Sequence, residues 1–307
     1  MKIGITIGDP AGIGPEIILK ALPLFSRDKL YIFANKNILK RTASDLGLTK
    51  NFKKIKCMIV DCVRDCDFYY GKPNKKTGQV AMESIDQALK ANLDIIITTP
   101  IVKEVIKLSH PDFIGHTEYL AQYYQTRKYA MVGLWRDKRI MLMTTHLPLR
   151  MIFKKLTAYA VFQKIQLLHW GLKKYFNKVK GSIGVCGLNP HPFEFSLGED
   201  EIIKAGVEKA RKKGIDAQGP FSADSIYNRN FDAYLAIYHD QAMIFLKSKK
   251  DGLNFTLGLP IIRISPLYGA ALDIAGKNLA QTSGLITAIK QGIKIYKNVR
   301  RFQRDEH

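Results

Sequence analysis

The feature that most constrains this chain is a regular alternation of short apolar runs with longer amphipathic stretches. The apolar runs have the length and composition of buried strands, whereas the stretches between them carry apolar residues at helical spacing. This alternation is typical of α/β domains, in which helices cover a largely parallel sheet. The expected strands are 2–7, 30–34, 94–98, 129–135, 139–144, 180–186, 233–238 and 260–264. The expected helices are 15–22, 78–91, 117–124, 156–176, 200–213 and 279–296.

Length and composition narrow the class of protein. The 307 residues are 46% hydrophobic and 24% charged, which is typical of a globular protein with one large or two medium domains. No apolar run approaches the roughly 20 residues that span a bilayer, and the N-terminus enters a strand without a signal-peptide pattern. The four cysteines fit neither a disulfide framework nor zinc-knuckle spacing. We therefore expect a cytoplasmic protein.

The net charge of +21 raises the question of a nucleic-acid partner. The basic residues are spread along expected helices and loops, as at Lys53, Lys154 and Arg211, and no recognised nucleic-acid-binding motif accompanies them. We favour general surface basicity, which also attracts anionic substrates. A basic nucleic-acid-binding protein stays open as the alternative from another class.

A glycine-rich turn, GDPAGIGPE, follows the first expected strand and runs from Gly8 to Glu16. A dinucleotide fingerprint needs a third glycine where Ile17 stands, and the next expected strand ends without an acidic residue for a ribose. A P-loop needs a Gly-Lys-Ser/Thr ending, which is absent from this turn. What remains is a strand-to-helix turn that needs unhindered backbone at Gly12 and Gly14.

Three histidines each follow an expected strand. They are His146 in TTHLPL, His191 in GLNPH and His239 in YHDQ. Ligand sites in parallel α/β sheets lie at the carboxyl ends of strands, and three converging imidazoles can hold a catalytic divalent cation with positions open to water or substrate. The alternative for each histidine is a hydrogen-bonded loop residue, because spacing alone does not bring the three together. Downstream, Lys247 and Arg263 are cations able to grip a phosphate or carboxylate.

Several segments together resemble one family, the 4-hydroxythreonine-4-phosphate dehydrogenases of vitamin B6 synthesis. They extend from Gly8 to Lys277 and read GDPAGIGPE, GHTEYLA, TTHLPL, GLNPH, GPFSADSIY, YHDQAMIFLK, NFTLGLPIIRIS and DIAGK. The resemblance implies the two-domain α/β/α fold of the isocitrate and isopropylmalate dehydrogenases, with the active site in the interdomain cleft and a homodimer. It implies an outer domain of residues 1–125 and 270–307, and an inserted domain of residues 126–269 with the metal ligands and the dimer interface.

The resemblance also implies roles for individual residues. The divalent-metal ligands, contributed across the dimer interface, match His146, His191 and His239. The substrate-binding positions match His116, Thr117, Lys247, Asn254 and Arg263. Acidic residues near the metal match Asp224 and Asp240. The general base stays open between Asp240 and a metal-bound hydroxide.

The segments expected to bind the cofactor and to follow His191 depart from the family pattern. Where the family reads D-H-G-T-A, this chain has Leu267, Tyr268, Gly269, Ala270 and Ala271. In the related decarboxylating dehydrogenases that histidine lies against the adenine, a position in which a tyrosine can still stack. After GLNPH, Phe193 and Phe195 replace glycines, and large side chains there narrow the space or change the loop. The expected cofactor-binding residues are Gly12, Gly14, Tyr268, Gly269 and Asp273.

The implied reaction is the NAD- or NADP-linked oxidation of 4-phosphooxy-L-threonine to 2-amino-3-oxo-4-phosphooxybutanoate, which decarboxylates to 3-amino-2-oxopropyl phosphate. A zinc, magnesium or cobalt ion would lower the pKa of the substrate's C3 hydroxyl and stabilise the enolate left by decarboxylation. The neighbouring alternative is oxidative decarboxylation of another phosphorylated hydroxy acid, of the 4-phosphoerythronate type. The choice of metal and the choice between NAD and NADP stay open.

Overall fold

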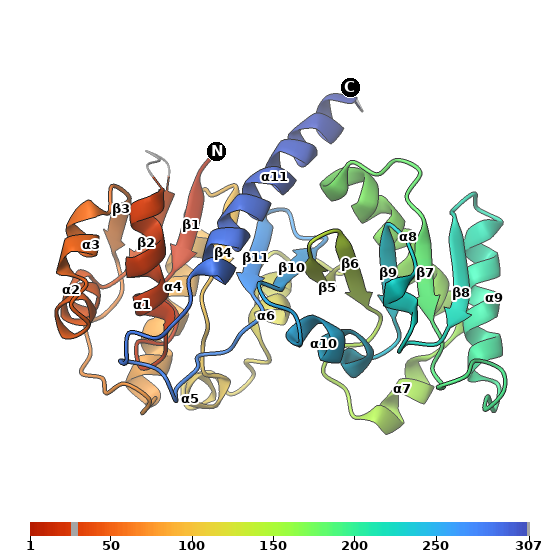
Figure 1. Cartoon of the computed structure of the whole chain (residues 1–307), viewed down its shortest axis with the longest axis horizontal. Coiled ribbons are helices and arrows are strands. Elements are labelled where there is room, and N and C mark those ends of the chain that lie inside the picture. The colour runs from red at the N-terminus through yellow and green to blue at the C-terminus, as the bar shows by residue number, and fades with distance from the viewer. Residues whose placement is uncertain (26–29, 306–307) are drawn as a thin grey trace. The chain divides into compact units, whose positions relative to one another are not determined.

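The structure is a computed structural model that describes residues 1–25 and 30–305. The chain packs into two compact units, each built from two stretches of sequence (Figure 1). The first unit is Met1–Gln125 with Leu259–Lys294, and the second is Thr126–Gly258 with the segment that begins at Ile295. These units are defined by packing alone, so the expected domain division stays a prediction.

A fully parallel sheet forms the centre of the first unit, in the order β3-β2-β1-β4-β11. Its strands are β1 (Ile3–Thr6), β2 (Leu30–Ala34), β3 (Met58–Asp61), β4 (Ile95–Thr98) and β11 (Ile262–Pro266). Ile3 pairs in register with Leu30 on one side and Ile95 on the other, and β1 and β4 are buried along their whole length. Their β-branched residues suit strands that are covered on both faces.

Helices pack around this sheet. They are α1 (Gly14–Ala21), α2 (Lys36–Asp45), α3 (Thr49–Lys54), α4 (Lys75–Lys90), α5 (Lys103–Lys107), α6 (His116–Tyr123) and the first part of α11 (Ser283–Asp305). Helix α4 packs against β1 and β2. Asn74 fixes the start of α4, because its side chain accepts from the Thr77 N–H while the Thr77 hydroxyl accepts from the Asn74 N–H.

The second unit has a mixed sheet in the order β10-β5-β6-β9-β7-β8. Its strands are β5 (Ala130–Trp135), β6 (Lys138–Leu142), β7 (Ile183–Cys186), β8 (Ala217–Phe221), β9 (Ala233–Ala236) and β10 (Leu253–Leu257). Strand β5 runs antiparallel to β10 and β6, whereas β6, β9, β7 and β8 are parallel to one another. The carboxyl ends of β6, β9 and β7 therefore lie side by side at one edge.

Four helices and the end of α11 complete the second unit. They are α7 (Leu149–Lys155), α8 (Ala158–Phe176), α9 (Glu199–Arg211) and α10 (His239–Lys247). Helix α8 packs against α9 and β9, and α10 packs against β5, β6 and β9. Tyr175 and Phe176 of α8 make edge contacts with the fully buried Phe255 of β10, which anchors α8 to the sheet.

The expected α/β class with a largely parallel sheet is confirmed, and the differences are local. The expected helix 156–176 is wrong at its start: α7 ends at Lys155 and α8 begins at Ala158, because the Thr157 side chain caps α8 by accepting from the Ala160 N–H. His239 opens helix α10 instead of lying in a loop. The elements that the sequence did not reveal are α2, α3, α5, α7, α10, β3, β8 and β10.

The structure also bears on membrane-spanning helices and on the state of the cysteines. Within residues 1–25 and 30–305, no helix combines the length and the apolar composition that crossing a bilayer requires. Cys57, Cys62, Cys66 and Cys186 are free thiols.

Asp9 is a fully buried carboxyl group in the glycine-rich turn between β1 and α1. It accepts hydrogen bonds from the Ala11 N–H at 2.9 Å and the Thr77 hydroxyl at 3.2 Å. Burial outweighs these bonds and raises its pKa from 3.8 to about 6. A folded-state pKa above the unfolded value means that the folded protein binds this proton more tightly. The contribution of Asp9 to the free energy of unfolding is therefore fully present below about pH 4, and it is lost as the pH rises to about 6.

We expect Asp9→Asn, which keeps a side-chain oxygen but cannot ionise, to gain stability relative to the unmodified chain as the pH rises from 4 to 7. For a shift of this size the gain is at most about 3 kcal/mol. Urea unfolding of both proteins at each pH measures it, with exposed Asp112→Asn as the control that should show no such trend. A constant difference between Asp9→Asn and the unmodified chain over this range would contradict the assignment.

Candidate functional site

Three histidines follow three neighbouring parallel strands at one edge of the second unit's sheet. His146 follows β6, His191 follows β7, and His239 follows β9. Strand β9 lies between β6 and β7 and is parallel to both. The segments that carry the three histidines consequently leave the sheet at the same edge, where parallel sheets form their ligand sites.

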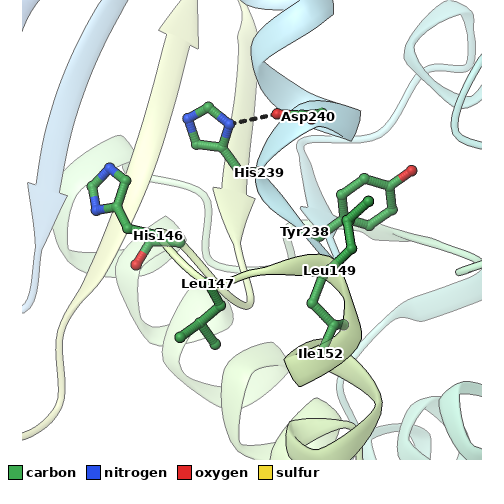
Figure 2. Close-up of a pocket in the computed structure, with 8 residues that line it drawn as sticks. His146, Leu147, Leu149, Ile152, Tyr238, His239 and Asp240 are labelled. Atoms are coloured by element: carbon green, nitrogen blue, oxygen red, sulfur yellow. Dashed lines mark hydrogen bonds and ion pairs between the residues drawn. The ribbon is translucent and has the colours of Figure 1, made fainter.

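His146 and His239 lie beside each other, with ring centroids 6.0 Å apart and ring planes inclined by 43°. A carboxylate oxygen of Asp240 lies 2.7 Å from Nδ1 of His239. This contact favours the tautomer with the proton on Nδ1 and a lone pair on Nε2. Figure 2 shows Nε2 of His239 on the side of the ring where His146 lies. Two imidazoles at this separation suit one divalent cation, since zinc binds imidazole nitrogen at about 2.0–2.1 Å.

A hollow of about 190 Å³ adjoins this pair (Figure 2). Its lining is partly polar and partly apolar, and comprises Thr145, His146, Leu147, Leu149, Ile152, Tyr238, His239 and Asp240. The side chain of His239 is 33% exposed, so solvent reaches the imidazole. An ion bound here would keep positions open to water or to a small substrate, as a catalytic metal needs.

His191 does not join this pair in a single chain. Its Nδ1 lies 3.4 Å from a carboxylate oxygen of Glu194, and its ring makes an edge contact with Phe195. Across residues 1–25 and 30–305, no three His, Cys, Asp or Glu side chains lie close enough together to hold a metal ion. The described part of one chain thus brings together two of the three predicted imidazoles.

A buried carboxylate holds the loop that carries His191. Asp200 in the first turn of α9 is fully buried and accepts hydrogen bonds from the Leu188 N–H at 2.8 Å, the Asn189 side chain at 3.0 Å and the Phe193 N–H at 3.4 Å. These bonds lie on both sides of His191 in the sequence and fix the path of the loop. Sequence reasoning missed Asp200, because acidic residues in a first helical turn are common for electrostatic reasons alone.

The phenylalanines that replace glycines lie next to this histidine. Phe193 has a φ of 72°, in the left-handed region that glycine adopts easily and bulky residues rarely. Its ring is 47% exposed, with the ammonium of Lys204 5.8 Å from the ring centroid. Phe195 is 58% exposed and takes up the space against the His191 ring. The loop therefore holds a bulky residue at a backbone conformation suited to glycine.

In the first unit, Arg263 and His116 form a basic cluster. Arg263 on β11 is 2% exposed and donates to the Thr98 hydroxyl on β4 at 2.8 Å. Burial lowers its pKa to about 10, which leaves it charged at neutral pH. Burial, with the charges of Arg263 and Lys103, holds the pKa of His116 well below its ordinary value, so this imidazole is neutral. A fixed cation beside a neutral imidazole suits an anionic ligand that also carries hydroxyl groups.

Nε2 of His116 and Oδ1 of Asn254, both in the expected substrate set, are buried polar atoms with no hydrogen-bond partner among the described residues. Such atoms are rare in folded proteins unless a ligand or water serves them. Asn254 lies on β10 across from Gly133 of β5. Both atoms therefore have the character of ligand contacts.

The other expected site residues vary in position. Thr117 is buried in the first turn of α6, and Lys247 is exposed at the end of α10. Asp224 is exposed between β8 and the 3-10 turn at Ile226–Asn228, and it does not line the hollow beside His146. Lys103, which bears on the pKa of His116, was missed because no motif marks it.

The glycines of the opening turn make room for the protein's own backbone. A Cβ on Gly14 would collide with the carbonyl oxygen of Ile7, and one on Gly12 would lie 2.9 Å from the carbonyl oxygen of Ala270. The Ile13 N–H also donates to the Ala270 carbonyl at 3.0 Å. Larger residues at Gly12 or Gly14 would thus strain the packing of the first unit directly, in addition to any effect on a cofactor.

Tyr268 belongs to the segment that this turn contacts. Its ring lies against the start of α11, where a Cβ on Gly284 would come 2.5 Å from Cε1 of the tyrosine. The ring is half-buried, whereas Gly269 and Asp273 are exposed. The opening turn and the expected adenine segment are therefore parts of one packed region, and their role in cofactor binding stays a prediction.

The fold is also found in a solved structure of low sequence identity. A crystal structure of a β-decarboxylating dehydrogenase from Thermococcus kodakarensis covers 97% of this chain and 83% of its own, with a TM-score of 0.51 at 15% identity. That similarity concerns the fold alone, and it is the fold expected from the sequence.

Closer similarities define the family. Residues 26–292 match the family described as pyridoxal phosphate biosynthetic protein PdxA. A 4-hydroxythreonine-4-phosphate dehydrogenase from a Sulfurihydrogenibium species is 38% identical over an alignment of 323 positions, which covers 98% of this chain and 100% of the relative. The crystal structure of the Klebsiella pneumoniae 4-hydroxythreonine-4-phosphate dehydrogenase is 30% identical, with a TM-score of 0.82 over 96% of this chain and 99% of that one. This chain belongs to the PdxA family, which confirms the resemblance found in its sequence motifs.

The backbone of Phe193 gives a stability prediction. The φ of Phe193 is 72°, a region that only glycine adopts without strain. We therefore expect the free energy of unfolding of Phe193→Gly to exceed that of Phe193→Ala by about 1 kcal/mol. The matched pair at Phe195, whose φ is not positive, should show the opposite order, since glycine there only adds unfolded-state entropy. Chemical denaturation of the four variants decides, and an alanine at 193 as stable as glycine would rule out the left-handed backbone.

Proposed function

We propose that this chain is a divalent-metal-dependent dehydrogenase that uses NAD or NADP to oxidise 4-phosphooxy-L-threonine. The product, 2-amino-3-oxo-4-phosphooxybutanoate, loses carbon dioxide to give 3-amino-2-oxopropyl phosphate. Membership of the PdxA family and the names of close relatives support this reaction. The single observation that carries it is the His146–His239 pair, with Asp240 on Nδ1 of His239, at the carboxyl ends of β6 and β9.

The donor set fits a divalent metal. His146 and His239 would hold the ion through imidazole nitrogens, and His191, from the neighbouring strand β7, would complete the set in a homodimer. When bound, the ion supplies Lewis acidity to the substrate's hydroxyl group and to the carbonyl group that oxidation produces. Imidazole ligands suit zinc and cobalt, and magnesium is the third candidate.

Asp240 has a role set by its contact. Because its carboxylate accepts the Nδ1 proton of His239, it keeps that imidazole in the tautomer whose Nε2 lone pair faces His146. Proton removal from the substrate hydroxyl then falls either to Asp240, once this contact is broken, or to a water-derived hydroxide. Asp224 is exposed and does not line the hollow, so it is the weaker candidate for acid–base work.

The substrate's anionic groups match the basic residues. In the first unit, Arg263 offers a buried, charged guanidinium, and neutral His116 offers Nε2 to a hydroxyl or amino group. Thr117 adds a hydroxyl group at the start of α6. In the second unit, Lys247 offers an ammonium group and Asn254 an unpaired amide oxygen. These side chains bind and orient the substrate in the proposal.

The proposal assigns the nicotinamide cofactor to the region around the opening turn. The Ile13–Ala270 hydrogen bond joins that turn to the segment with Tyr268, whose aromatic ring can stack on adenine. The assigned residues are Gly12, Gly14, Tyr268, Gly269 and Asp273. A homodimer and a cytoplasmic location also belong to the proposal.

An assay of the purified chain tests this function. We expect cofactor reduction, followed at 340 nm, with 4-phosphooxy-L-threonine in the presence of Zn²⁺, Co²⁺ or Mg²⁺, and little after chelation. 4-Phosphoerythronate, the alternative substrate, is assayed in parallel with both NAD and NADP. Inactivity on the first substrate under every condition would refute the proposal, and turnover of 4-phosphoerythronate alone would favour the alternative.

Replacing the imidazoles tests the metal assignment. We expect His146→Ala and His239→Ala to lose bound metal and more than about 100-fold in kcat/KM, because loss of a ligand costs more than loss of a ligand's supporting partner. His110→Ala, in a first-unit turn beside Ser109, is the control and should keep both. Metal content by mass spectrometry and steady-state kinetics provide the readouts. Full metal and activity in both variants would show that the imidazole pair is not the metal site.

A further inference from the structure

One side chain joins the ends of the two strands that precede His239 and His191. Gln241, in the first turn of α10, accepts from the Ile237 N–H through Oε1 at 2.8 Å and donates to the Gly187 carbonyl through Nε2 at 2.7 Å. Ile237 follows the end of β9, and Gly187 follows the end of β7. The orientation of the amide is unambiguous, because one partner is an N–H donor and the other a carbonyl acceptor.

This bridge begins where the sheet ends. The last register pair between β7 and β9 is Val185 with Leu235, so the ladder between these two strands ends before it reaches Gly187 and Ile237. Gln241 continues the connection with a side-chain amide, which has a donor and an acceptor like the peptide groups it replaces.

The backbone of Ile237 is also hydrogen-bonded to the segment that follows β6. Its carbonyl accepts from the Thr144 hydroxyl at 2.7 Å and from the Thr144 N–H at 3.3 Å. Thr144 is buried and precedes His146 by two positions in the sequence. Through the backbone of one fully buried residue, Ile237, Thr144 and Gln241 therefore connect the three segments that lead to His146, His239 and His191.

Gln241 is itself held in place. The Tyr227 hydroxyl donates to its backbone carbonyl at 3.0 Å, and the Tyr227 ring is 5% exposed and packs on Phe245, with centroids 4.7 Å apart. The side chain of Gln241 is half-buried, its amide oxygen and amide nitrogen both make hydrogen bonds, and its backbone is held by Tyr227. It therefore has little freedom to rearrange.

We propose that Gln241 is a positioning residue that sets the spacing of the strand ends carrying the three histidines, and so prepares the chain to bind a divalent cation. This proposal rests on the metal site of the proposed function. A carboxylate at this position keeps the acceptor for Ile237 but loses the donor for Gly187, and a thioether of similar length loses both. Metal sites need such support, because small shifts of a ligand's backbone misplace its nitrogen.

The test is Co²⁺ binding by the full-length chain, measured by calorimetry and by the visible absorption of the bound ion. We expect Gln241→Met and Gln241→Glu to weaken Co²⁺ binding about 10–100-fold, the effect usual for partners that orient metal ligands. Gln303→Met, at an exposed position of α11, is the matched control and should bind like the unmodified chain. Circular dichroism and thermal unfolding without metal check that each variant folds.

The outcomes separate the two levels of the proposal. If the unmodified chain binds Co²⁺ and His239→Ala does not, but both folded Gln241 variants bind with unchanged affinity, the positioning role is refuted while the metal site stands. A lower unfolding temperature with unchanged affinity has the same meaning, because it reduces Gln241 to a structural residue. If the unmodified chain fails to bind Co²⁺, or if His146→Ala and His239→Ala bind it equally well, the metal site and the positioning role are refuted together.

Discussion

The parallel pairing of β9 with both β6 and β7 is the constraint on which the candidate site depends. In this register three separate segments leave the sheet at one edge, although the histidines they carry are far apart in sequence. Packing of α8 against β9, and of α10 against β6 and β9, buries this part of the sheet and stabilises the register. Had one of these strands been reversed, its histidine would lie at the opposite edge. The chemistry proposed for this chain therefore begins with strand direction.

The fold class could be predicted from the sequence because it depends on hydrophobic periodicity, which is a local property. Ile3, Ile5 and Ile95–Ile97 show a buried parallel strand in their composition alone. Elements with weak patterns were missed, such as β10, whose residue Asn254 interrupts the apolar run, and α10, which begins at His239 directly after a strand. Their structure depends on long-range packing, which a window of sequence does not contain.

The candidate site could be predicted only in part. Motifs identified the histidines because all three follow expected strands, and family resemblance supplied the substrate set. The supporting residues Asp200, Thr144 and Gln241 were not found, since their importance depends on which backbone groups they reach. The separation of His191 from the other two imidazoles also depends on contacts with Glu194 and Phe195, which strand order does not specify.

The hydrogen bond between Ile13 and Ala270 determines how late in synthesis the first unit can finish folding. Strand β1 is made long before Ala270, which completes its turn, and β4 gains its neighbour β11 only once residues 262–266 have been made. The sheet of the second unit, by contrast, is encoded without interruption between β5 and β10. Because synthesis proceeds from the N-terminus at about 5–20 residues per second, the first unit waits, partly formed, for about 7–27 seconds while the 133 residues from Thr126 to Gly258 are added.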